Sequence, residues 1–181
     1  DNNNDGFLDL PVSEQINLMN RWQYTDLENG WVSFLSWRYL NDEKLLGALS
    51  YNPQKDRGMK SHWGSEIITK RWDASFKVGY VFPEIPYQSF GFQTAYSNHD
   101  QDSYYGLRTY DINQQSFYTN LIFNSIIGNT LNKFKVGLNY SFDEYVEQVD
   151  GDLYNRTDRN VGSFFEFSHD NNDNFSWIAG I

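Results

Sequence analysis

Period-two alternation of apolar and polar residues is the feature that most restricts how this chain can fold. The clearest example is the segment 72–82, where Trp72, Ala74, Phe76, Val78, Tyr80 and Phe82 alternate with Asp73, Ser75, Lys77 and Gly79. Successive side chains of a β-strand point to opposite faces of the sheet, so this pattern predicts a strand with one apolar and one polar face.

The same alternation recurs along the chain, whereas helical periodicity is weak throughout. It predicts strands over residues 15–24, 31–40, 72–82, 90–96, 117–127, 134–142 and 161–169, with an eighth that begins at Phe175. All four prolines lie in loops or turns outside these segments, where they remove no hydrogen bond from a strand ladder. The chain is therefore expected to be all-β.

The connections between the predicted strands differ in length. Residues 26–30, 83–89, 128–133 and 170–174 are short, whereas 41–71, 98–115 and 143–160 are long and polar. Alternating short turns and long loops are typical of up-and-down outer-membrane barrels, whose periplasmic turns are tight and whose extracellular loops are elaborated. The expected fold is an antiparallel up-and-down transmembrane β-barrel, with residues 1–181 forming one partial barrel domain of about eight strands.

Composition is compatible with this expectation. Aromatic residues make up 18% of the chain, and Tyr and Trp settle at both water–lipid interfaces of a membrane. Mean hydropathy is −0.68, but a barrel wall averages lipid-facing and water-facing residues. The formal net charge of −10 argues against nucleic acid as a partner, and the absence of Cys excludes disulfides and thiolate sites.

The residues opposite the apolar face are expected to form a charged and amide-rich wall that faces the barrel interior. They are Arg21, Gln23, Arg38, Lys77, Gln93, Asn120, Asn124, Lys135, Asn139 and Glu166.

The opening segment, Asp-Asn-Asn-Asn-Asp-Gly-Phe-Leu-Asp, has the oxygen ligands of a calcium loop at alternate positions and a Gly at position six. We expect Asp1, Asn3, Asp5 and Asp9 to supply side-chain ligands to a structural Ca²⁺. Position twelve is Val12 instead of Glu, so the loop departs from the EF-hand. The alternative is a solvated turn rich in Asx residues.

Catalytic motifs are absent, and we expect no enzymatic activity. The sequence has neither a Gly-x-Ser-x-Gly elbow nor a glycine loop that could cradle phosphate. His62 and His99 are candidates for contact with a metal-bearing substrate, because imidazole binds iron or haem. Their loop neighbours are included as candidates, namely Trp63, Tyr104 and Tyr105. Solvated loop histidines are the commoner case.

The opening segment, the following stretch 15–24, and the segments 30–34 and 70–73 resemble the mid-barrel region of TonB-dependent outer-membrane receptors, in the branch common in Bacteroidetes. The resemblance implies a fragment of a 22-stranded barrel in the bacterial outer membrane. It implies energised import of an iron chelate, haem or cobalamin. Membrane lipid, the TonB complex and a surface lipoprotein are the expected partners. The plug and the TonB-engaging segment of that family have no counterpart in this chain.

Two other readings are compatible with the sequence. One is a secreted, Ca²⁺-stabilised, carbohydrate-binding β-sandwich, in which the aromatic residues would fill a core or stack on sugars. The other is a complete small eight-stranded structural barrel.

Overall fold

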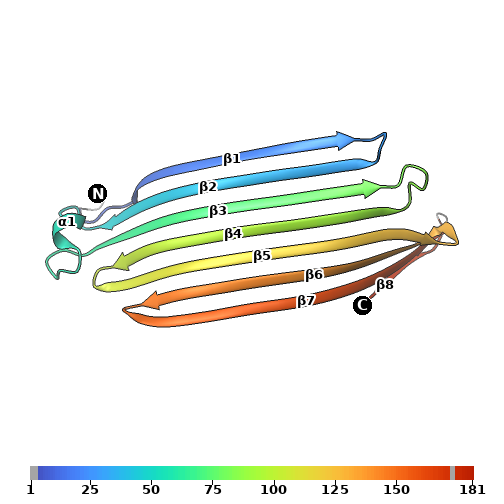
Figure 1. Cartoon of the computed structure of the whole chain (residues 1–181). Helices are drawn as coiled ribbons and strands as arrows, with labels where there is room; N and C mark the ends of the chain where they lie inside the picture. The colour runs from blue at the N-terminus through green and yellow to red at the C-terminus, as the bar shows by residue number, and fades with distance from the viewer. Residues whose placement is uncertain (1–3, 172–173) are drawn as a thin grey trace.

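In the computed structural model, residues 4–171 and 174–181 are described, and they form one antiparallel sheet of eight strands in chain order. Every strand pairs with its sequence neighbours, so the topology is an up-and-down meander (Figure 1). The elements are β1 (Val12–Asp26), β2 (Trp31–Gly47), α1 (Pro53–Asp56), β3 (Gly64–Val81), β4 (Ser89–Tyr105), β5 (Arg108–Ile127), β6 (Asn129–Val149), β7 (Asp152–Asp170) and β8 (Ser176–Gly180).

Strands β1 to β7 run along the length of the sheet, whereas β8 is short, and the turns define the two ends of the sheet (Figure 1). The proximal end carries the turns 27–30, 82–88 and 128, and the distal end carries the turns 106–107 and 150–151 together with the loop 48–63. All predicted strands are present at their predicted places in the chain.

The predicted long loops are mostly wrong. Residues 98–115 and 143–160 continue the strands, and only two residues separate β4 from β5 and β6 from β7. The loop expected over residues 41–71 is reduced to 48–63, because β2 extends to Gly47 and β3 begins at Gly64. The strict short–long alternation expected from the sequence is therefore not observed.

The turn at residues 150–151 shows why the chain reverses so tightly at the distal end. Asp150 and Gly151 both have positive φ, 52° and 95°, which is the Asp-Gly pattern of a two-residue hairpin that matches strand twist. Asp150 also accepts hydrogen bonds from the Thr109 backbone N–H at 2.9 Å and from Arg108 Nε at 2.9 Å, and these bonds link it to β5. Together with the N–H of Thr109, the Arg108 guanidinium holds the pKa of the Asp150 carboxyl below its usual value.

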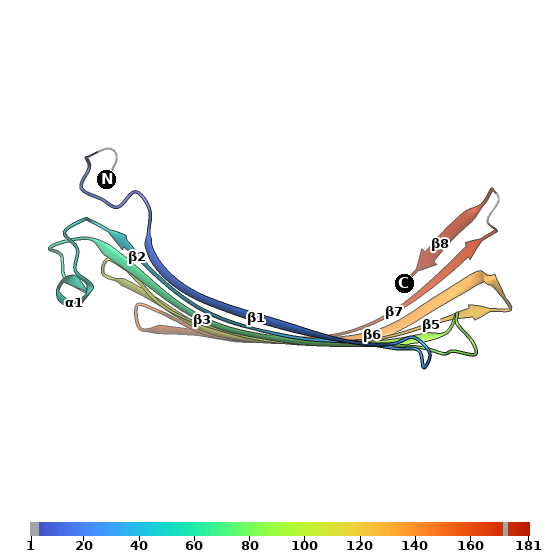
Figure 2. The same ribbon diagram turned by 90° about the horizontal axis from the view of Figure 1, so that it is seen from above.

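The sheet is a single curved layer (Figure 2). Its accessible surface is 12332 Å², whereas a globular monomer of 21.3 kDa would expose about 9,100 Å². Among the described residues only one apolar side chain, that of Tyr104, is buried. The sheet therefore has no second layer over either face and no interior core.

A β-sandwich would require two stacked sheets, and the described residues form only one. A complete small barrel would require β1 to pair with β8, but these strands lie at opposite edges of the sheet. Within the described ranges, no helix is both long and apolar enough to cross a membrane.

Candidate functional site: two faces and a polar groove

Most apolar residues of the alternating segments lie on one face of the sheet, whereas Val32, Phe34 and Ile122 lie on the other. The strand register places Leu35 beside Phe76, Val78 beside Phe92, and Leu121 beside Leu138. We call this set the apolar belt. Its members are Leu18, Trp22, Tyr24, Trp31, Leu35, Trp37, Tyr39, Trp72, Phe76, Val78, Tyr80, Phe90, Phe92, Tyr96, Phe117, Leu121, Phe123, Phe134, Val136, Leu138, Tyr140, Phe142, Val161, Phe165 and Phe167.

The belt is exposed. Phe76, Leu121 and Leu138 are 36%, 43% and 57% exposed, so these side chains do not converge on a dry centre. Along β3 the belt positions 72, 74 and 76 are exposed, whereas the polar positions 71, 73 and 75 between them are half-buried. A sheet of a water-soluble protein buries its apolar face, whereas in this stretch the apolar positions are more exposed than the polar ones.

Aromatic rings form a row along the proximal edge of the belt. Successive ring centroids lie 4.6 to 6.3 Å apart across β2 to β7, a spacing typical of attractive aromatic pairs. The row comprises Trp31, Tyr80, Phe82, Phe90, Phe123, Phe134 and Phe165.

A second aromatic group lies toward the distal edge of the belt. The ring centroids of Tyr39 and Trp72 are 4.6 Å apart, and those of Trp37 and Trp72 are 6.4 Å apart. From Phe82 to Trp72 the chain covers about 33 Å along the strand, or about 23 Å when tilted by 45°. The separation of the two aromatic groups therefore matches the roughly 25 Å apolar band of a barrel wall.

The opposite face is predominantly polar, although Met19, Phe34, Tyr118 and Ile122 also lie on it. All ten predicted wall residues lie on it, from Arg21 on β1 to Glu166 on β7. Lys135 Nζ contacts Glu166 Oε1 at 2.8 Å, and the Ser36 and Ser75 hydroxyls lie 2.7 Å apart. Asn120 and Asn124 each bury an Oδ1 atom that has no hydrogen-bond partner among the described residues.

The curvature of the sheet gives it a convex and a concave face. In Figure 2, α1 lies on the convex side of the curved sheet. The loop that carries α1 packs on Tyr104, which shares its face with Phe90, Phe92 and Tyr96 of the belt. The apolar belt is therefore on the convex face, and the polar wall is on the concave face.

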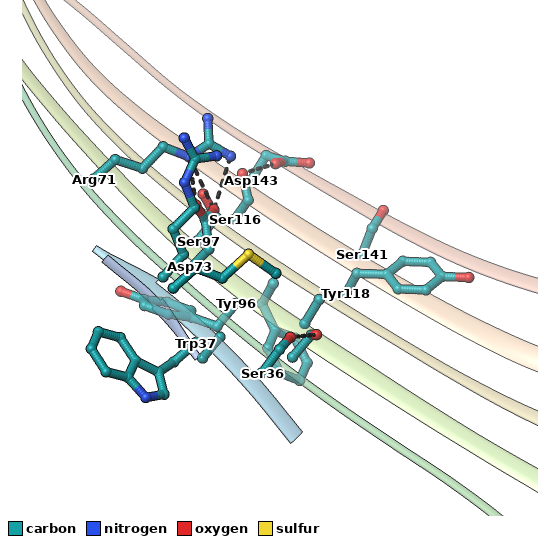
Figure 3. Close-up of a pocket in the computed structure, with 16 residues that line it drawn as sticks. Ser36, Trp37, Arg71, Asp73, Tyr96, Ser97, Ser116, Tyr118, Ser141 and Asp143 are labelled. Carbon is teal, nitrogen blue, oxygen red and sulfur yellow. Dashed lines mark hydrogen bonds and ion pairs between the residues drawn. The ribbon is translucent and has the colours of Figure 1, made fainter. Parts of the chain in front are cut away.

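A groove of about 680 Å³ crosses the middle of the polar wall. Small residues form its floor on five neighbouring strands, namely Ser36, Ser75, Ala95, Ser97, Ser116 and Ser141. In Figure 3, Arg71, Asp73, Ser116 and Asp143 gather at one end of the groove, and Ser36 lies at the other. Small side chains keep this stretch of wall open, because larger ones on the same face would fill it.

Charged groups line the groove unevenly. The Arg71 guanidinium binds both carboxylate oxygens of Asp73, with its Nε 3.0 Å from each and its Nη2 2.9 Å from Oδ1. Arg38 Nε donates instead to the neutral Asn17 Oδ1 at 3.0 Å. Asp143 on β6 accepts a hydrogen bond from the Ser116 hydroxyl on β5.

The distal loop 48–63 is held to the convex face by Tyr104. This residue is 2% exposed, its hydroxyl lies 2.7 Å from that of Tyr51, and the Arg57 guanidinium lies 4.5 Å from its ring centroid. Burial, together with the hydrogen bond to Tyr51, raises the pKa of Tyr104 well above its usual value. Tyr104 thus anchors the loop, and its side chain is inaccessible to a large ligand.

The five sequence-predicted substrate residues do not form one site. Trp63 lies on the distal loop beside Phe7, and the two ring centroids are 6.3 Å apart. The Trp63 side chain is 49% exposed. His62 Nδ1 lies 3.5 Å from Asp56 Oδ1 in the same loop. His99 and Tyr105 lie on the concave face, where His99 is paired with Arg71. Six residues of β4, or about 20 Å, separate His99 from Tyr105.

Asp56 is the residue of this loop that holds several of its polar groups together. Its carboxylate accepts hydrogen bonds from the Asn52 backbone N–H at 2.9 Å and from the Ser61 hydroxyl at 3.0 Å. These bonds, with His62 nearby, hold the pKa of Asp56 below its usual value.

Two of the four predicted calcium ligands, Asp1 and Asn3, lie outside the described residues. Asp5 Oδ1 accepts a hydrogen bond from the Phe7 N–H at 2.8 Å, and Gly6 has the positive φ (81°) that the sharp turn of a calcium loop requires. Phe7 forms a bridge to Ala48, which ties this segment to the loop after β2. Among residues 4–171 and 174–181, no group of three or more His, Asp or Glu side chains is arranged to hold a metal ion.

No protein-family model matches the chain, and no curated protein or solved structure matches it either.

The groove on the concave face is the feature that sequence reasoning missed. Its signal was present as small residues at alternate positions, for example Ser36 on β2, Ser75 on β3 and Ser97 on β4. These residues align only when the strand register is known.

Proposed function

We propose that this chain forms part of the wall of an outer-membrane β-barrel that imports a scarce nutrient. One observation carries the proposal: the convex face of a single-layered sheet exposes a continuous apolar belt, while the concave face carries mostly polar and charged side chains. Hydrocarbon would cover the belt and remove the cost of exposing it to water, whereas the concave face would line a wet interior.

The open edges support a barrel wider than eight strands. The long edge strand β1, with 15 residues, carries unpaired backbone groups along one side, and such groups cost several kcal/mol each in lipid. Further strands must therefore pair with both edges in the membrane. A wide barrel leaves an interior large enough for a solute, as in transporters of the TonB-dependent class that the sequence resembles.

Spin-label accessibility tests the orientation of the two faces. The chain contains no Cys, so single Cys substitutions at Leu121 and Asn120 label neighbouring positions on opposite faces without background. In membrane-inserted protein, a label at 121 should collide with oxygen, which concentrates in lipid, and a label at 120 with a water-soluble nickel complex. Equal accessibility of both labels to the nickel complex would contradict a membrane wall.

Energised uptake tests the transport role. Cells that depend on this protein should take up an iron chelate, haem or cobalamin, and a protonophore that collapses the inner-membrane gradient should abolish the uptake. Uptake that continues without the gradient would point to passive diffusion and against the TonB-dependent mechanism.

Calcium binding by the opening segment is a separate part of the proposal. If Ca²⁺ binds the folded protein through Asp5 and Asp9, saturation at a hundred times the dissociation constant would stabilise it by about 2.7 kcal/mol. The thermal midpoint should rise with Ca²⁺ more than with Mg²⁺, and Asp5→Asn with Asp9→Asn should remove the difference. An unchanged difference in the double variant would exclude this segment as the site.

A further inference from the structure

The concave face over β1 to β3 carries a surplus of positive charge, although the whole chain has a net charge of −10. Five cations lie on this part of the face: Arg21, Arg38, Lys44, Arg71 and Lys77. The only two carboxylates among them are Asp42, which contacts Lys44 at 2.6 Å, and Asp73, which contacts Arg71 at 2.9 Å. Three cations are thus left in excess.

We call these three, Arg21, Arg38 and Lys77, the positive patch. Arg21 lies over the Phe34 ring, with its guanidinium carbon 4.7 Å from the centroid, and Arg38 donates to the neutral Asn17. In the described part of the chain, none of the three forms an ion pair. The next carboxylate in the groove is Asp143 on β6, which is three strands, or about 14 Å, from β3.

The patch adjoins the groove. A smaller pocket of about 190 Å³ lies between Arg21 and Lys77, and it shares Met19, Ser36 and Ser75 with the groove. Serine hydroxyls beside guanidinium and ammonium groups are the donors that bind carboxylate and phosphate oxygens. The strand register separates the Cα atoms of the patch by about 8 to 14 Å, so its long side chains can reach two anionic groups at once.

We propose that the positive patch and the adjoining groove bind a solute that carries two or more carboxylate or phosphate groups. This inference rests on the proposed function, in which the concave face lines the path of an imported nutrient, and it narrows the substrate to a polyanion. An iron chelate built on several carboxylates fits this wall, whereas a substrate without free anionic groups would leave the patch uncompensated.

Calorimetric titration of the detergent-solubilised protein with ferric citrate, inorganic pyrophosphate, acetate and cyanocobalamin tests the proposal. Ferric citrate and pyrophosphate should bind with an affinity that falls as salt is raised, and acetate should bind far more weakly. The double variant Arg21→Gln with Lys77→Gln should bind the polyanions at least tenfold more weakly. The matched control, Lys55→Gln with Lys60→Gln, makes the same charge change in the distal loop and should stay within twofold of the parent.

Absence of polyanion binding to the parent, or equal weakening in the two double variants, would overturn the proposal. A gel-shift on heating in dodecyl sulfate checks that both variants fold. The outcome is independent of the membrane assignment, since spin-label accessibility tests that separately. Energised uptake that persists unchanged in the patch variant would leave the importer standing and remove the patch from its path.

Discussion

Placing an Arg in the apolar belt provides the sharpest test of where the lipid lies. Leu121 and Tyr118 are both on β5, are 43% and 36% exposed, and lie on opposite faces. If the convex face contacts hydrocarbon, Leu121→Arg places a cation near the middle of the apolar band, at a cost of about 2–4 kcal/mol. Tyr118→Arg faces the wet concave side, where surface substitutions usually change stability by about 0.5 kcal/mol or less.

The expected difference of at least 1.5 kcal/mol corresponds to more than a tenfold change in the folding equilibrium. Urea unfolding of the protein inserted in phospholipid vesicles, followed by Trp fluorescence, would measure it. A belt Arg that costs no more than the concave-face Arg would mean that both faces contact water. The reasoning from the apolar belt would then fail, whatever the shape of the sheet.

Three further outcomes are expected from the local contacts. Removing the hydroxyl pair by Tyr51→Phe or Tyr104→Phe should each cost about 0.5–1.5 kcal/mol, with no further loss in the double variant, as measured by hydrogen exchange of the distal loop. Gly30→Ala should destabilise the protein by about 2 kcal/mol or more, because φ is +76° and the new Cβ would clash with the backbone carbonyl oxygen of Val81. Gly91→Ala, where no atom lies within 4 Å of the new Cβ, is the control, and equal melting temperatures of the two variants would contradict this. Since the pKa of Asp56 is lowered by folding, its contribution to loop stability should be present above the ordinary carboxyl pKa and lost as pH falls through the lower folded value; acid-dependent proteolysis of loop 48–63 should therefore disappear in Asp56→Asn.

The sequence located the strands but underestimated their length, and the reason is physical. Alternation is visible only where one face is apolar, as from Trp72 to Phe82. Distal to the belt both faces of the sheet are polar, so residues 98–105 and 108–115 have the composition of a loop although they pair in register. The tight turns at Gly106 and at Asp150-Gly151, which have positive φ, lie within polar stretches of this kind and reverse the chain there.

The candidate site was less predictable than the fold. Tyr104 was expected to contact a substrate, but burial under the distal loop makes it a structural residue. The assignment of residues to two faces was accurate because it follows from strand periodicity alone. The groove and the surplus of cations depend on which side chains are neighbours across strands. Those neighbours are set by the strand register, which cannot be derived from the predicted turn lengths alone.

The strands extend well beyond the apolar belt at the distal end, and this affects how the proposed barrel would bind a ligand there. The longest strand, β6, has 21 residues and measures about 69 Å, whereas the apolar belt takes up only about 33 Å of strand. If the belt spans a bilayer as proposed, the remainder would extend beyond it as a stiff array of paired hairpins. A rigid rim of this kind loses little conformational entropy when a ligand binds, so binding there would use a preorganised surface.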